Sequence, residues 1–184
     1  MCVASEARRA EAAPDGCYNR CMIPEGKVLA EDGVAVVARG DTFIMVYQAP
    51  SRLVRTKWMF AWMDKFLAQR SGGIVVFVVV LPTSDPPDGP TRKENAAQLR
   101  KFDSRLRLMV SAAVGDAFRT AIVRTVMRAL AAIHGKSGVH FVVNTIHDGV
   151  NRVREAASED TPSRSQLMED LRAAHSALGV ELPA

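Results

Sequence analysis

The chain has 184 residues, of which 48% are apolar and 24% are charged, and its formal net charge is +4. This is the usual balance of a globular domain with a real core. No stretch reaches the roughly 18 consecutive apolar residues of a membrane-spanning helix, and the N-terminus lacks the apolar core of a secretory signal. We therefore expect a cytoplasmic protein with no membrane partner.

Residues 1–31 mix Ala, Glu, Arg, Pro and Gly without periodicity, so we predict a disordered tail. This tail holds all three cysteines, Cys2, Cys17 and Cys21. An odd number of cysteines outside the expected core argues against a disulfide framework. Cys17 and Cys21 have no two further ligands nearby, so we expect no metal site and no cofactor.

Residues 34–38 and 42–48 are predicted strands of a hairpin that turns at Gly40-Asp41. Ser51 is the predicted N-cap of a helix that continues to about Arg70 and stops before Gly72-Gly73. The apolar residues of this helix recur with a period of 3.6 and cover a broad arc. They are Val54, Trp58, Met59, Phe60, Trp62, Met63, Phe66 and Leu67.

Residues 74–81 are all apolar, which predicts a strand covered by helices on both faces. A proline-rich loop follows. Thr91 and Glu94 have the spacing of a capping box, which predicts a helix that begins at Thr91 and continues to about Arg105. The remaining predicted elements are a strand at 106–114, a helix at 116–133, a strand at 139–145, a helix at 147–157 and a last helix within 161–179.

The order is therefore β-β-α-β-α-β-α-β-α plus an extra C-terminal helix, which predicts an α/β fold with a mixed four- to five-stranded sheet. We expect a tail at 1–31, an α/β domain at 32–157, and a linker with the C-terminal helix at 158–184.

This order resembles that of the STAS domain of bacterial anti-sigma-factor antagonists, over about 120 residues from Val34 to Ala156. The stretches GDAFRTAIVRTVMRALAAI and HDGVNRV are also similar to uncharacterised STAS-like bacterial proteins. The resemblance implies a regulatory module whose serine or threonine, after the strand that follows the first helix, is phosphorylated by a partner kinase. The corresponding segment here is LPTSDPPDGPTRKEN, with Thr83, Ser84 and Thr91 as candidate phosphosites.

The residues of this loop allow two interpretations. A phosphate on Thr91 would lie at a helix N-terminus, where N–H groups favour an anion, or Thr91 is simply a helix cap. Asp85 and Asp88 are either cation ligands or solvated turn residues.

Arg119 falls in the predicted buried stripe of the helix 116–133, whereas Arg124 and Arg128 fall on its solvated face. The stripe comprises Phe118, Ile122, Val123, Val126, Leu130 and Ile133. Because an unpaired buried charge is costly, Arg119 is either a candidate anion-binding residue or the partner of Asp116 or Asp85.

Two features point to a protein partner. Residues 92–128 carry nine basic and three acidic side chains. This basic strip either meets an acidic partner or nucleic acid, or is a solvated helix face. The apolar arc of the first helix is broader than one sheet needs. Its candidate partner surface is Trp58, Met59, Phe60, Trp62 and Met63, unless the C-terminal helix covers it.

The chain contains no G-x-S-x-G, P-loop or G-x-G-x-x-G motif, so we do not expect an enzyme. We expect a regulatory, signalling module that binds a protein partner or forms a homodimer, and we do not expect nucleic acid as a partner. The alternative is a small-molecule or anion sensor that uses the loop 82–91 and the start of the helix at 117.

Overall fold

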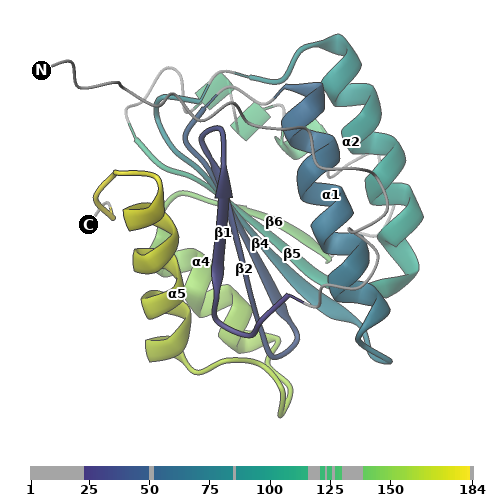
Figure 1. The fold of residues 1–184 in the computed structure, drawn as a ribbon, viewed down its shortest axis with the longest axis vertical. Coiled ribbons are helices and arrows are strands. Elements are labelled where there is room, and N and C mark those ends of the chain that lie inside the picture. Colours follow the sequence, from purple (N-terminus) through teal and green to yellow (C-terminus); the bar gives the residue numbers. More distant parts are fainter. Residues whose placement is uncertain are drawn as a thin grey trace, which may run out of the picture.

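The computed structural model describes residues 23–49, 52–84, 86–115, 121, 122, 124, 125, 127–129 and 139–182. Their centre is a six-stranded mixed sheet that lies between two layers of helices (Figure 1). In the order of the sheet the strands are β1 (Val28–Glu31), β2 (Val34–Arg39), β3 (Thr42–Tyr47), β4 (Ile74–Val80), β5 (Leu106–Ala113) and β6 (His140–Val143).

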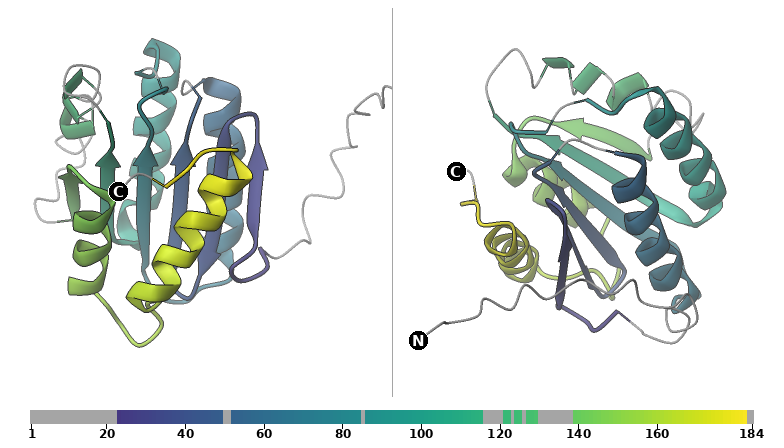
Figure 2. Two further views of the ribbon diagram at one scale, coloured as in Figure 1. Left: turned by 90° about the vertical axis from the view of Figure 1, so that its left-hand side faces the viewer. Right: turned by 45° about the horizontal axis from the view of Figure 1, so that its top comes forward.

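Strands β1, β2 and β3 form an antiparallel meander, and β3 to β6 are all parallel. Each new parallel strand is added on the same side of the last, so right-handed crossovers place the connecting helices on one face of the sheet. The described helices on that face are α1 (Leu53–Ala68) and α2 (Gly89–Phe102), the latter followed by a 3-10 turn, η1 (Asp103–Arg105). Helices α4 (Ile146–Glu155) and α5 (Arg164–Ala177) cover the other face (Figure 2).

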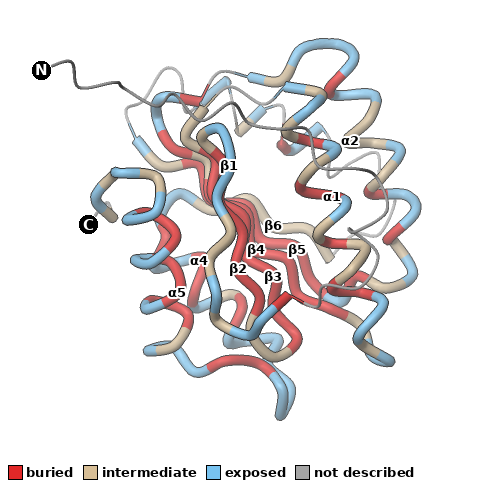
Figure 3. The backbone as a smooth tube through the Cα atoms, in the orientation of Figure 1, coloured by how far each residue is buried: buried red, intermediate tan, exposed pale blue. Residues whose placement is uncertain are grey.

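Strand β4 is buried on both faces, as its uninterrupted apolar sequence predicts. It pairs with β3 on one side and β5 on the other. Val76 and Val78 belong to the core beneath α1 and α2, whereas Val75 and Phe77 belong to the core beneath α4 and α5. Among the described residues, the central strands are therefore the most continuously buried part (Figure 3).

The predicted α/β class and mixed sheet are confirmed, but the sheet has six strands rather than four or five. The additional strand is β1, in a segment that we predicted to be disordered. Its four residues, VLAE, show no alternation of their own, and they become a strand by pairing with β2. Residues 1–22, including the cysteines, lie outside the described residues.

Helix α5 is part of the domain and not an appendage after a linker. Leu167, Leu171 and Ala174 are fully buried and share one core cluster with β2, β3 and β4. The helix begins with a capping box in which Ser163 and Gln166 each accept a hydrogen bond from the other's backbone N–H. Helix α5 therefore packs on the sheet together with residues that precede the predicted boundary at 157.

Two predicted helix details are wrong. The N-cap of α1 is Arg52, which makes no side-chain capping bond, and not Ser51, which lies outside the described residues. Between β5 and β6 the described residues 121, 122, 124, 125 and 127–129 are helical, but Ile122 is 42% exposed.

Arg124, predicted to be solvated, is half-buried and donates to the carbonyl oxygen of Ala113 at 3.3 Å. Apolar residues occur all around this Ala-rich helix, so its periodicity does not specify which side faces the sheet. The other residues of the predicted stripe lie outside the described residues: Phe118, Val123, Val126, Leu130 and Ile133.

Candidate functional site

The start of the loop after β4, residues 82–84, lies at the carboxyl ends of the parallel strands, where open α/β sheets usually bind ligands. Both of its hydroxyls contact the end of β3. Thr83 donates to the carbonyl oxygen of Gln48 at 2.6 Å, and Ser84 donates to that of Ala49 at 2.9 Å. Thr83 is exposed, whereas Ser84 is 4% exposed. These bonds hold the loop against the sheet.

Asp88, and not Thr91, caps α2. The Asp88 carboxylate accepts a hydrogen bond from the backbone N–H of Thr91 at 2.8 Å, and Pro90 occupies the first turn. Hydrogen bonding to Thr91 holds the pKa of the Asp88 carboxyl below its ordinary value. Thr91 is fully buried, so Thr83 alone among the three candidate phosphosites is exposed.

The predicted anion site at Arg119 lies outside the described residues, as do its candidate partners Asp85 and Asp116. Asp85 belongs also to the predicted cation site, whose other member, Asp88, has its carboxylate engaged as the cap of α2.

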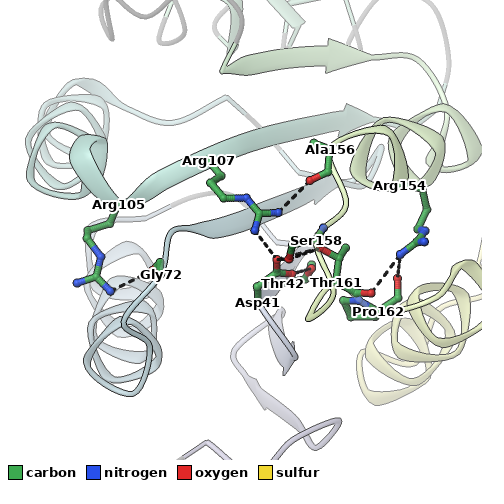
Figure 4. Close-up of polar contacts among 10 residues, drawn as sticks. All are labelled: Asp41, Thr42, Gly72, Arg105, Arg107, Arg154, Ala156, Ser158, Thr161 and Pro162. Atoms are coloured by element: carbon green, nitrogen blue, oxygen red, sulfur yellow. Dashed lines mark hydrogen bonds and ion pairs between the residues drawn. The ribbon is translucent and has the colours of Figure 1, made fainter.

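A polar cluster lies at the other end of the parallel strands, where β3 begins, around the buried carboxylate of Asp41 (Figure 4). Its Oδ2 accepts from Ser158 Oγ at 2.8 Å and from Thr161 Oγ1 at 2.9 Å, and it pairs with Arg107 at 2.9 Å. Its Oδ1 accepts from Thr42 Oγ1 at 3.0 Å. Four donors engage the carboxylate, so we interpret this cluster as a structural clamp.

The clamp fixes the connection between α4 and α5 to the sheet. Arg154 donates to the carbonyl oxygens of Thr161 and Pro162, and Arg107 donates to that of Ala156 (Figure 4). A Cβ atom on Gly40 would lie 1.8 Å from the carbonyl oxygen of Asp160, so only glycine allows this approach. Sequence reasoning missed the clamp because its members come from distant segments with no shared motif.

Only part of the predicted partner surface on α1 faces outward. Met59, Phe60 and Met63 are core residues, and Phe60 stacks on Phe102 of α2 with ring centroids 5.8 Å apart. Trp58 and Trp62 are half-buried.

Val54, Trp58 and Trp62 form the apolar stripe of α1. They are spaced four residues apart and therefore lie on one side of the helix. The two indoles meet edge to face at 6.3 Å, and Lys65 Nζ lies 4.2 Å from the Trp62 ring centroid. Val54 is 76% exposed. Helix α5 does not cover this stripe, because it packs on the opposite face of the sheet (Figures 1 and 2).

The structure also brings together Ser111 of β5 and His140 of β6, whose Oγ and Nε2 atoms are 3.0 Å apart. Sequence reasoning missed this pair, which only the register of the two strands reveals. Ser111 is 1% exposed, so the contact joins two strands in the interior.

Within the described ranges, no group of three or more His, Cys, Asp or Glu side chains is arranged to hold a metal ion. Nor is any helix there long and apolar enough to cross a membrane. Comparisons of the chain with family models, with curated proteins and with solved structures give no match.

Proposed function

We propose that this chain is a non-enzymatic module that binds another protein through the outer surface of α1 and α2. The observation that carries the proposal is the apolar stripe of α1. Tryptophan is enriched at the centres of protein interfaces, where it contributes much of the binding energy. Val54 and Ile122 are the exposed large hydrophobic residues of the described chain, and Val54 extends the indole pair.

The surroundings of the stripe indicate the charge of the partner. Helices α1 and α2 carry two acidic residues, Asp64 and Glu94, and seven basic ones, so their net charge is +5. The basic residues are Arg55, Lys57, Lys65, Arg92, Lys93, Arg100 and Lys101. The whole chain has a charge of +4, so the remaining residues together have a net charge of −1. An apolar centre with a basic surround favours a partner with an acidic surface.

The alternative, a sensor that binds small molecules or anions at the loop 82–91, has less support. The Thr83 and Ser84 hydroxyls already donate to backbone carbonyls, and Asp88 already caps α2. The bacterial regulatory role implied by the STAS resemblance stays a hypothesis, because no family or structural match bears on it.

Site-specific photo-crosslinking in the native host tests the proposal. A photoreactive residue at position 54 lies in the stripe, and one at Ala157 lies at the exposed start of the connection between α4 and α5. We expect a crosslinked species of defined mass from position 54 and not from position 157.

The crosslinked protein is then purified, and its binding to the chain is measured by calorimetry. Trp62→Asp should weaken that binding at least tenfold, whereas Ala157→Asp should leave it unchanged. Equal crosslinking at both positions, or binding that is indifferent to Trp62→Asp in a folded protein, would refute the role of the stripe.

A further inference from the structure

The two helical layers of this protein have opposite charges. Residues 146–182, which include α4 and α5, hold four basic and seven acidic side chains, a net charge of −3. The acidic ones are Asp148, Glu155, Glu159, Asp160, Glu169, Asp170 and Glu181. Asp170 is buried and paired with Arg39 of β2, which leaves a net charge of −2 in this layer. Arg55 of α1 is likewise paired with Asp32, which leaves +4 on α1 and α2.

The acidic layer also contains a surface cavity of about 640 Å³, which we call the α5 groove. It lies between α5, the start of α4 and the C-terminal segment 179–182. Met168, Val180 and Leu182 form its apolar lining, and Arg172 and Glu181 contribute charged groups. The guanidinium of Arg172 makes no hydrogen bond or ion pair with the other described residues.

We propose that the apolar stripe of one copy of this chain occupies the α5 groove of a second copy. This inference rests on the proposed function and names the acidic partner as the chain itself. The α5 groove offers the apolar stripe an apolar lining and charged neighbours. The Met168 thioether and the Arg172 guanidinium are favourable neighbours of an indole ring. Glu181 offers a carboxylate to Lys65, which lies over Trp62.

Charge complementarity favours this arrangement over a symmetric dimer. A two-fold interface built on α1 would place two basic layers against each other, and like charges in an interface cost affinity. Contact between the basic layer and the acidic layer brings opposite charges together. Because these layers lie on opposite faces of one sheet, each copy keeps one free surface of each kind (Figure 2). The expected assembly is an open head-to-tail chain.

Three designed proteins test this assembly. The stripe variant is Trp58→Asp with Trp62→Asp, and the groove variant is Ser176→Lys with Glu181→Lys, both at exposed positions of the groove. The control, Ala173→Lys with Glu159→Lys, adds the same charge as the groove variant at exposed positions outside the groove. Circular dichroism and thermal unfolding establish that each variant is folded.

Sedimentation and light scattering then report the mass. The wild-type mass should rise above the 20.0 kDa of one chain as concentration increases, and it should return to that value at high salt. Each variant alone should remain monomeric, and the control should assemble. An equimolar mixture of the two variants should form a dimer and stop there, because only one intact stripe and one intact groove remain.

The inference is overturned if the wild type stays monomeric at every concentration, or if the mixture fails to dimerise. It is also overturned if the groove variant assembles as the wild type does. In each case, crosslinking of position 54 to a different acidic protein would still uphold the proposed function, so the two failures are distinguishable.

Discussion

Arg39 and Asp170 lie 131 positions apart in the chain and form a two-bonded ion pair, with N–O distances of 2.8 and 2.7 Å. Arg39 ends β2, and Asp170 lies in the middle of α5. The aspartate side chain is 2% exposed and the arginine side chain 24% exposed. This pair joins the last helix to the sheet.

Asp170→Ala should therefore destabilise the fold by about 3 kcal/mol, because it leaves a partly buried guanidinium without its counter-charge. Urea unfolding followed by circular dichroism measures the loss. Glu159→Ala, at an exposed position that does not contact Arg39, is the control and should change stability by less than about 0.5 kcal/mol. Equal effects of the two substitutions would show that the pair contributes nothing specific.

Gly149→Ala should destabilise the protein although alanine is the better helix former. A Cβ atom at position 149 of α4 would lie 2.4 Å from the ring of Phe77, which is fully buried in β4. The cost of overpacking, about 1–3 kcal/mol, outweighs the gain in helix propensity of about 1 kcal/mol. Gly89→Ala is the matched control, since no atom other than those of its chain neighbours and its own helix backbone lies within 4 Å of its Cβ position. Thermal unfolding should show a lower midpoint for the first variant only.

Stability should fall as the pH drops below about 6.5, the ordinary pKa of histidine. His175 is fully buried in α5, and its Nδ1 donates to the carbonyl oxygen of Leu171 at 2.7 Å. Burial lowers the pKa of His175 in the folded protein. The unfolded chain therefore binds the proton more readily, and protonation favours unfolding with a slope of up to about 1.4 kcal/mol per pH unit.

Urea midpoints at pH 7.5, 6.5 and 5.5 measure this dependence. His175→Leu should reduce it, whereas His147→Gln, at an exposed position of α4, should leave it as in the wild type. An unchanged pH dependence in folded His175→Leu would rule out His175 as its origin.

Thr83 is the candidate phosphosite that a kinase can reach in the folded protein, and modification should break its bond to Gln48 because a phosphorylated oxygen no longer donates. Phosphopeptide mass spectrometry on protein from the native host should find Thr83 modified, if any of the three is, and not Ser84 or Thr91. Thr83→Val, which also removes the donor, should cost about 1 kcal/mol, and Thr83→Ser should cost less. A phosphate on buried Thr91 would contradict this assignment.

Local sequence patterns were sufficient to predict those helices and strands that form in the same way whichever neighbour covers them. The apolar run of β4 predicts a strand covered on both faces, whichever helices cover it. The hairpin of β2 and β3 and the existence of α1 and α5 follow in the same way from short-range periodicity. The N-cap of α2 could not be predicted in this way, because both Asp88 and Thr91 are good cap residues. In the structure Asp88 has the extended backbone of an N-cap and accepts the capping hydrogen bond.

The tertiary structure alone decided which surfaces remain exposed. The sequence of α1 shows a broad apolar arc but does not say whether α5 covers it; the pairing of Asp170 with Arg39 and the burial of Leu171 place α5 on the far side of the sheet. Strand β1, the Asp41 clamp and the separation of a basic layer from an acidic one likewise join segments far apart in the chain. The secondary structure of a residue depends largely on its near neighbours in sequence. Its exposure depends on the distant segment that packs against it, and local sequence patterns do not contain that information.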